Sequence, residues 1–389
     1  MNQRDLTLLL EILSQPTAPF REHRVIDVVT HTLRIHDVPH FLDPIGNVIV
    51  GCSSRRDYAH RLRTRTQEPL RVYVAHMDHP GFHGTRWLGR DRLHVKWHGG
   101  GPTRHLAGAP VWLADGEARL YEGRMRKARL SANGRSIETA EVTLTDAPGE
   151  RIAANALYGG FSFRAPVWRA GRKLYTKAAD DLVGVYAVIR TAIACARRDS
   201  FADFLGVLTR AEEVGFVGAI GHFELGWLAR ARRPIVCVSL ETSRTLPNAL
   251  IGKGPVVRLG DRRTVFDPNA LNVLAQVAER RLPGKYQRRI MDGGTCEATA
   301  ATVYGLPAIG ISIPLGNYHN QGLEGGPDSR GQNGPSPEFV HQDDIDGMVA
   351  LCRGLLEPGL PWHGAWVHEK SLYKRRLRGF QALLGTAGA

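Results

Sequence analysis

Cysteine is scarce in this sequence of 389 residues, which has only five, and no two of them form a Cys-x-x-Cys pair. That number and spacing argue against a disulfide scaffold and a cysteine-rich structural zinc site, and they fit a reducing compartment. The sequence also lacks an apolar run of about 18 residues, the length that a membrane span needs. The apolar stretch 6–13 is short, carries Glu11 and is typical of an amphipathic helix rather than a signal peptide. We therefore expect a soluble, cytoplasmic protein.

Acidic residues are outnumbered, because 51 Lys and Arg stand against 38 Asp and Glu and give a formal net charge of +13. Such an excess is compatible with nucleic acid, an anionic membrane, an acidic substrate or simply a solvated surface. No recognised nucleic-acid-binding module accompanies it, and the basic segment 370–378 is predicted to be a solvated or docking helix. We expect neither nucleic acid nor a membrane as a partner.

Four short apolar runs predict strands that are buried on both faces of a largely parallel sheet: 71–75, 204–209, 234–240 and 307–314. Helical periodicity follows two acidic pairs, Asp180-Asp181 and Asp343-Asp344, and a cap with a first-turn proline, Asp267-Pro268. Alternating strands and helices of this kind indicate an α/β fold, with a mixed, mostly parallel sheet sandwiched by helices.

The stretch 85–165 has a different character, since it is rich in Gly and Arg, contains short alternating segments and has no long helical period. We interpret it as a small β-rich domain inserted into a discontinuous α/β domain, which comprises residues 1–84 and 166–389. The length suits two such domains. The Gly- and Pro-rich segment 325–337 has no hydrophobic period and is predicted to be a long surface loop.

Polar side chains gather where the predicted strands end, which is where open α/β sheets bind their ligands. They are His76, Asp78, Glu212, Glu213, Glu241 and His319, and Asp180 joins them at a helix start. Histidines and carboxylates without cysteine are the ligands that zinc or a similar divalent ion prefers in a catalytic site. A ligand set of the two histidines and three of these five carboxylates would be too large for one tetrahedral zinc but would suit two ions that share a carboxylate.

Each of these residues also has an ordinary interpretation. A single His-x-Asp is common, Asp180-Asp181 is a plausible helix cap, and Glu212-Glu213 could be an exposed pair in a loop. Glu241 and His319 are uninformative one at a time. A site is favoured because all of them occur together, at strand ends and beside glycines.

The order of these motifs resembles that of the co-catalytic dinuclear zinc exopeptidases, and most closely the M42 glutamyl-aminopeptidase-like branch, which is related to the M20 and M28 groups. The matching stretches are VAHMDHPGF (74–82), KAADDLVGV (177–185), TRAEEVGFVGA (209–219), GGTCEATAA (293–301) and ISIPLGNYHN (311–320). Weaker similarity in 16–25, 46–50 and 336–344 extends the resemblance over nearly the whole chain. The place of the insertion, between the first His and the Asp-Asp pair, also resembles M42.

The resemblance implies a zinc-exopeptidase-like fold and a ligand set for two ions. His76 and Glu241 would bind one ion, and Glu213 and His319 would bind the other. Asp180 would bridge both ions.

The resemblance also implies roles for two residues beside the ions. Asp78 would hydrogen-bond the far nitrogen of His76 and fix its tautomer, and Glu212 would be the general base. The sequence departs from the family in having Glu241 where M42 usually has Asp, and Gly-Thr-Cys-Glu-Ala at 294–298 where the family has Gly-Thr-Asp-Ala. The loop 325–337 intrudes before Glu338, the acid that aligns with the family.

The resemblance therefore predicts a metallo-aminopeptidase that hydrolyses N-terminal residues from peptides. Its cofactors would be two divalent ions, zinc first and cobalt or manganese as alternatives, and it would form a homo-oligomer. One alternative is an M20-like metal-dependent amidohydrolase, a deacylase or dipeptidase. Another is a non-catalytic protein that keeps the fold and uses its basic surface for partners.

Overall fold

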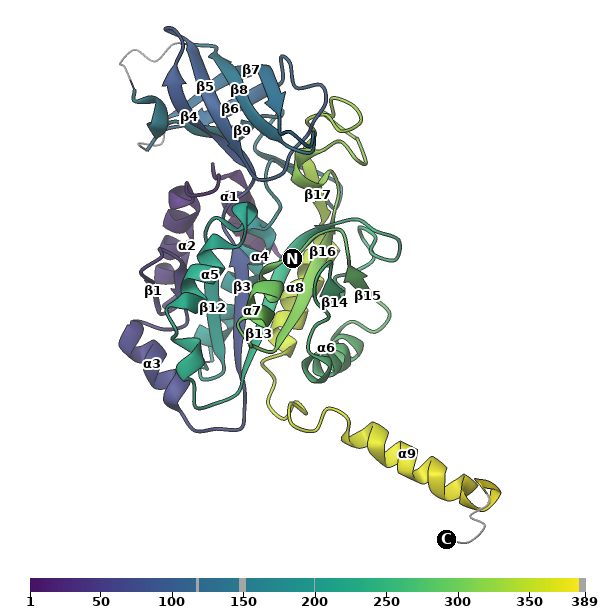
Figure 1. Cartoon of the computed structure of the whole chain (residues 1–389). Helices are drawn as coiled ribbons and strands as arrows, with labels where there is room; N and C mark the ends of the chain where they lie inside the picture. The colour runs from purple at the N-terminus through teal and green to yellow at the C-terminus, as the bar shows by residue number, and fades with distance from the viewer. Residues whose placement is uncertain (117–118, 147–151, 199, 385–389) are drawn as a thin grey trace.

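The computed structural model describes residues 1–116, 119–146, 152–198 and 200–384. An eight-stranded sheet with helices around it forms the larger part of the molecule, and a closed β-barrel lies at one end of it (Figure 1). The last long helix, α9 (Val367–Phe380), projects from the body and has no buried residue. None of the described helices is long and apolar enough to cross a membrane.

The sheet has the strand order β1-β2-β12-β3-β13-β16-β14-β15. Its strands are β1 (His40–Leu42), β2 (Val48–Val50), β12 (Phe204–Thr209), β3 (Leu70–His76), β13 (Ile235–Arg244), β16 (Ala308–Leu315), β14 (Val256–Asp261) and β15 (Gln287–Met291). Neighbours are parallel from β12 through β3 and β13 to β16. Strand β2 is antiparallel to β1 and β12, whereas β14 is antiparallel to β16 and parallel to β15. The four predicted apolar runs form the four central strands. The predicted α/β fold with a mixed sheet is confirmed.

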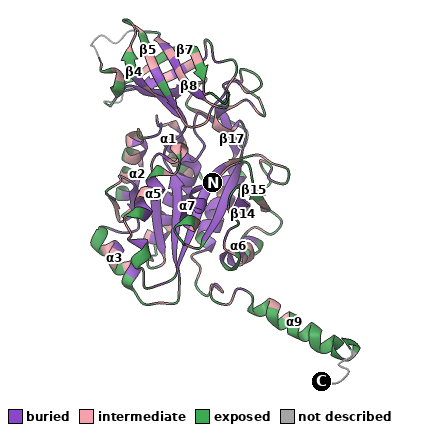
Figure 2. Cartoon of the chain, in the orientation of Figure 1, coloured by how far each residue is buried: buried purple, intermediate pink, exposed green. Residues whose placement is uncertain are grey.

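Burial explains why the central strands have near-continuous apolar runs. Every residue of β3, β12 and β16 is buried, and Figure 2 shows the centre of the large sheet in the colour of buried residues. Helices α4 (Leu182–Ala196) and α8 (Gln342–Gly354) pack together and contact β3 and β16. Helix α7 (Glu297–Val303) packs with α5 (Val217–Glu224) and contacts β13 and β16.

The remaining helices of the α/β part are α1 (Gln3–Ser14), α2 (His23–Ile35), α3 (Arg55–Arg63) and α6 (Pro268–Arg281). Helix α1 is amphipathic, as predicted for the stretch 6–13: it buries Leu6, Leu9, Ile12 and Leu13 and leaves Leu10 half-buried. Helix α6 begins at the cap and first-turn proline that its sequence predicts. Asp267 accepts a hydrogen bond from the amide of Ala270 at 2.8 Å, and Pro268 opens the first turn.

The barrel has the closed strand order β4-β5-β8-β7-β6-β9. Its strands are β4 (Gly81–Trp87), β5 (Arg92–His98), β8 (Ile137–Leu144), β7 (Leu120–Leu130), β6 (Pro110–Ala114) and β9 (Tyr158–Phe161). The barrel has its own apolar core, in which Phe82, Trp97 and Phe161 pack together. The domain boundaries at 85 and 165 stay a prediction.

A small sheet joins the two parts of the molecule near the barrel. It consists of β10 (Val167–Ala170), β11 (Lys173–Thr176) and β17 (Glu338–His341) in antiparallel pairs. Its register sets Glu338 opposite Thr176, just before the segment that contains Asp180. The segment 325–337 that leads into β17 contains neither helix nor strand, as expected of a loop.

The cap of α6 gives a direct test of the fold. Asp267→Ala should lower the free energy of unfolding by about 1 kcal/mol, because the amide of Ala270 loses its acceptor. Urea unfolding followed by circular dichroism measures the change. Asp267→Asn keeps an accepting oxygen and should recover most of the loss; an alanine variant with the unfolding curve of the parent protein would contradict the capping role.

Candidate metal centre

The parallel strands bring candidate ligands from distant segments to one edge of the sheet. His76 is the last residue of β3 and pairs with Thr209, the last residue of the parallel strand β12. The short helix η2 (Glu212–Val214), which carries both predicted glutamates, therefore begins beside His76. Glu241 comes from β13 on the other side of β3, and it lies within that strand rather than beyond its end.

Two further candidates come from connections between elements. Asp180 precedes α4, and its neighbour Asp181 is the helix cap, because the Asp181 carboxylate accepts a hydrogen bond from the amide of Gly184 at 3.1 Å. His319 lies in η4 (Tyr318–Asn320), which follows β16. The capping and ligand interpretations of the Asp-Asp pair are thus divided between its two members.

The carboxylate of Asp180 lies between the two histidines. Its Oδ1 is 3.5 Å from Nε2 of His76, and its Oδ2 is 3.6 Å from Nε2 of His319. The hydroxyl of Thr242 donates a hydrogen bond to Oδ1 at 3.0 Å and so fixes the orientation of the carboxylate. One oxygen directed at each histidine is the arrangement that a ligand shared by two ions requires.

Two groups of possible metal ligands share Asp180. The ligand atoms of His76, Asp180 and Glu241 lie within 4.8 Å of one another, and so do those of Asp180, Glu213 and His319. Within the second group, Nε2 of His319 is 3.1 Å from Oε2 of Glu213. These side chains could hold metal at the edge of the sheet.

The centre has more buried negative charge than its protein surroundings satisfy. Oε1 of Glu213, Oε1 of Glu241 and Oδ2 of Asp181 are buried and have no hydrogen-bond partner among the described residues. Burial, together with the charge of Asp180, raises the pKa of Glu241 to about 8. An unpaired buried carboxylate is costly and needs a proton or a cation. The donor set and its unpartnered oxygens therefore fit divalent cations.

The two histidines respond to the same charges. Burial alone would lower the pKa of His319, but Glu213 and Asp180 outweigh it and raise that pKa to about 10. Burial opposes protonation of His76 in the same way, and Glu212 and Asp180 again raise its pKa. A histidine must be neutral to bind a metal, so a cation at this centre takes the place of protons.

Glu212 lines an open cavity of about 250 Å³, together with the ligand candidates. Its Oε2 lies 3.9 Å from Nε2 of His76. Burial, and then the charges of Glu241 and Glu213, raise the pKa of Glu212 well above its usual value. A carboxylate in such surroundings can accept and return a proton near neutral pH.

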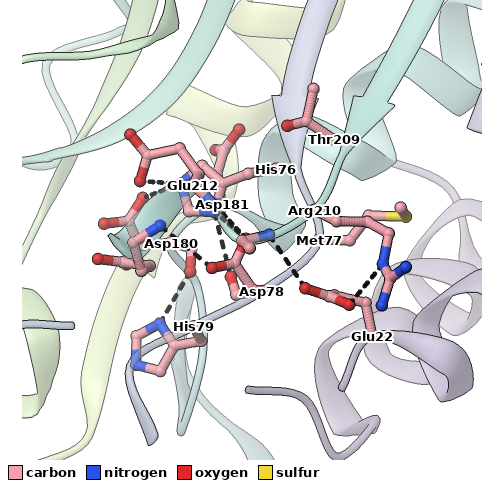
Figure 3. A network of polar contacts seen from close by, with 12 residues as sticks. Glu22, His76, Met77, Asp78, His79, Asp180, Asp181, Thr209, Arg210 and Glu212 are labelled. Carbon is pink, nitrogen blue, oxygen red and sulfur yellow. Dashed lines mark hydrogen bonds and ion pairs between the residues drawn. The ribbon is translucent and has the colours of Figure 1, made fainter. Parts of the chain in front are cut away.

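Asp78 holds the turn that carries the two glutamates. Its carboxylate accepts hydrogen bonds from the amides of Glu212 at 2.9 Å and Glu213 at 3.1 Å (Figure 3). Nδ1 of His76 is 3.1 Å from the backbone carbonyl of Asp78 but 3.7 Å from its carboxylate. Asp78 therefore supports His76 through its backbone, where the sequence predicted its side chain. Donation to that carbonyl puts the proton on Nδ1 and leaves Nε2 free for a ligand bond.

Glu22 supports the same turn from the other side, a role that no motif in the sequence indicates. Ala211, directly before Glu212, has a left-handed φ of 52°. Its amide donates to the buried carboxylate of Glu22 at 3.0 Å, and Arg210 pairs with that carboxylate at 2.7 Å (Figure 3). The only signal for Glu22 was the weak similarity in 16–25.

Glu338 is a second supporting residue whose role was missed. It is fully buried and accepts hydrogen bonds from three backbone amides, those of Ala179 at 2.7 Å, Asp180 at 3.2 Å and His319 at 2.8 Å. One carboxylate thus fixes the backbones of the shared ligand and of the late histidine. The only indication of this role in the sequence was the position of Glu338 directly after the loop 325–337, where it aligns with an acid of the family.

His79 and Glu297 complete the buried surroundings of the centre. His79 contacts the carbonyl of Asp180 at 2.8 Å and the side chain of Asn320 at 3.2 Å. Glu297, the acid of the altered Gly-Thr-Cys-Glu-Ala stretch, accepts a hydrogen bond from Thr209 at 2.5 Å, and burial raises its pKa to about 7. Both support backbone or strand-end residues of the centre.

A model of the M42 glutamyl aminopeptidase family matches residues 158–323, which include Asp180, Glu212, Glu213, Glu241 and His319. An aminopeptidase from the archaeon Desulfurococcus kamchatkensis has a similar solved structure, with a TM-score of 0.72 and 22% identity over 92% of this chain and 96% of that chain. The TET1 peptidase of Pyrococcus horikoshii, described as assembling into a tetrahedron or a large octahedral shell, gives 0.69 and 19% over 91% and 99%. An M18-family aminopeptidase from Thermotoga maritima gives 0.61 and 12% over 92% and 97%.

The support that Asp78 gives to the turn can be tested by metal binding. Asp78→Asn should weaken zinc binding by on the order of 10–100-fold. Each carboxylate oxygen of Asp78 accepts a hydrogen bond from one backbone N–H, and in the variant the side-chain NH₂ group would face one of these N–H donors. Equilibrium dialysis against zinc measures the affinity. The exposed Asp37→Asn is the matched control and should bind as the parent protein does; equal affinities for the two variants would contradict the supporting role.

Proposed function

We propose, from its confirmed resemblance to the M42 peptidases, that this chain is a metal-dependent aminopeptidase. The observation that carries the proposal is the carboxylate of Asp180, which directs one oxygen at His76 and the other at His319. Carboxylates with unpartnered oxygens lie on both sides of it. This arrangement supports a pair of ions better than a single one.

His76, Asp180 and Glu241 would hold one ion, and Asp180, Glu213 and His319 would hold the other. Histidine and carboxylate ligands without cysteine favour zinc, and cobalt or manganese suit the same donors. The five cysteines are buried and free, in agreement with a reducing, cytoplasmic setting.

Divalent ions bound at this centre would supply Lewis acidity that activates water and polarises a peptide carbonyl. Glu212 lines the cavity beside both ligand groups, so its carboxylate is placed to take a proton from the attacking water. Return of that proton from Glu212 to the leaving amine would complete the cleavage. The acidic cavity would also hold the positively charged α-amine of a free N-terminus, which favours an exopeptidase.

A recess beside the cavity supports a preference for acidic N-terminal residues. Arg258 and Arg244 line it, and it shares Glu241 and Tyr318 with the cavity. Arg258 is buried, donates to the hydroxyl of Ser243 at 3.1 Å, and has an Nε without a partner among the described residues. A guanidinium pairs well with a carboxylate in a desolvated place such as that of Arg258, whereas Arg244 is exposed.

The partners that we propose are peptides and further copies of this chain. A homo-oligomer is supported by the solved structures of similar proteins, one of which is described as a dodecamer and another as a tetrahedron or octahedral shell. Those assemblies belong to proteins that are 18% and 19% identical to this one.

Substrate choice separates an aminopeptidase from an M20-like amidohydrolase. Aminoacyl anilides with free α-amines should be cleaved, with glutamyl and aspartyl anilides showing a higher kcat/KM than leucyl or lysyl anilides. N-acyl amino acids should not be cleaved, because their acylated nitrogen has no positive charge for the acidic cavity to bind. Cleavage of blocked substrates alone would sink the aminopeptidase assignment and favour the deacylase.

Two neighbouring glutamates should give different variants. Glu212→Gln should keep two ions per chain yet lose activity by about 10²–10⁴-fold, because it removes a proton acceptor and no ligand. Glu213→Gln should lose the ion that it shares with His319. Metal analysis after gentle purification, combined with turnover on a glutamyl anilide, distinguishes the two. Near-normal turnover in Glu212→Gln would show that another group is the base.

A further inference from the structure

Three consecutive glycines, residues 99–101, connect the barrel to the candidate metal centre. They follow β5 of the barrel and lie next to His319, which belongs to the α/β part of the molecule. No phosphate-loop pattern accounts for them, because no Lys-Ser/Thr pair and no strand–helix context follow. We call residues 99–101 the glycine segment.

Gly100 packs directly against the ring of His319. A Cβ added to Gly100 would lie 2.1 Å from Nδ1 of His319 and 2.9 Å from its Cε1. Real Cβ atoms do not approach a ring so closely, so a side chain at this position requires the ring or the glycine segment to move. Nε2 of the same ring, which is bonded to Cε1, faces Asp180 at 3.6 Å and Glu213 at 3.1 Å.

The glycine segment is itself held in place by the barrel. The indole N–H of Trp97 donates a hydrogen bond to the carbonyl of Gly100 at 2.8 Å, and the Trp97 ring packs in the barrel core against Phe161. Gly99 has a φ of +85°, and an added Cβ there would lie 3.1 Å from Pro80. The segment therefore sits between Pro80, close to Asp78, and His319.

The loop 325–337 fastens the next part of the barrel chain to the α/β part. The amides of Thr103 and Arg104 donate to the carbonyl of Asn333 at 3.0 and 3.1 Å. In return, the guanidinium of Arg330 donates to the carbonyls of His105 and Ala107, both at 3.1 Å. The loop that interrupts the family pattern thus attaches residues 103–107, which follow the glycine segment, to the α/β part.

His319 depends on such support because its backbone is unfavourable. Its φ is 55°, and both Asn317 and Asn320 are also left-handed, at 55° and 56°. Such conformations are unfavourable for residues other than glycine and persist only when the surroundings fix them. Glu338 fixes the backbone of His319 through its amide at 2.8 Å, whereas its ring is stacked on Tyr318 with centroids 3.7 Å apart.

We infer that the glycine segment of the barrel positions the ring of His319 and thereby sets the affinity of the ion site formed by Asp180, Glu213 and His319. The inference rests on the proposed two-ion function. It makes Gly100 and Trp97 positioning residues, and it gives the inserted barrel a part in the centre although the barrel supplies none of the candidate ligands.

The test compares two glycine-to-alanine variants of the barrel. Gly100→Ala should weaken binding of the second zinc ion by on the order of 10–100-fold, the loss usual when a ligand histidine loses its orientation, and should leave the first ion in place. Gly89→Ala is the matched control, because the nearest atom to its added Cβ is Nε of Arg92 at 3.8 Å. Calorimetric titration of zinc into metal-free protein measures both sites. Cobalt absorption spectra show whether one site has changed its ligand geometry.

A second variant keeps the test decisive if Gly100→Ala does not fold. Trp97→Phe removes the hydrogen bond to Gly100 but keeps an aromatic ring in the barrel core, and it should weaken the second ion alone. Two ions bound with parental affinity in either folded variant would overturn the inference and leave the proposed function intact. A parent protein that binds fewer than two ions would overturn the two-ion proposal and the inference with it.

Discussion

Buried negative charge around Asp180 is the constraint on which the rest of the structure depends. Five carboxylates, from Asp180, Asp181, Glu212, Glu213 and Glu241, meet at the edge of the sheet, and three of their oxygens have no partner among the described residues. Such a cluster is unstable unless protons or cations neutralise it. Three other buried carboxylates, those of Asp78, Glu22 and Glu338, accept hydrogen bonds from backbone amides. They fix the turns that carry the ligand candidates and do not occupy ligand positions themselves.

Much of this organisation could be predicted, because it depends on local pattern. The four central strands had near-continuous apolar runs, since both of their faces are buried, and the cap of α6 had its Asp-Pro pair. Most of the candidate residues were found from a simple rule, that the carboxyl ends of parallel strands meet at one edge, and their assignment as ligands came from the family resemblance. The family model then matched the stretch that contains all of the ligand candidates except His76.

The missing part of the prediction concerns contacts between residues far apart in the chain. Glu338 supports His319 and Asp180 across 19 and 158 positions, and Gly100, which follows β5 of the barrel, contacts His319. Neither has a local pattern, because a buried acid that accepts from amides resembles any other acid in a sequence. The support of His76 by the carbonyl of Asp78 was missed for a related reason: every residue has a carbonyl, so a sequence does not single one out.

The scattered origin of the centre has a consequence for biosynthesis. Its parts come from β3, the segment before α4, η2, β13 and η4, so the last ligand candidate is made only after four-fifths of the chain. Contacts of such long sequence separation form late in folding. A nascent or partly folded chain therefore contains no complete centre. With the proposed function, the chain would be inert while it is being synthesised and would become active only with its finished tertiary structure.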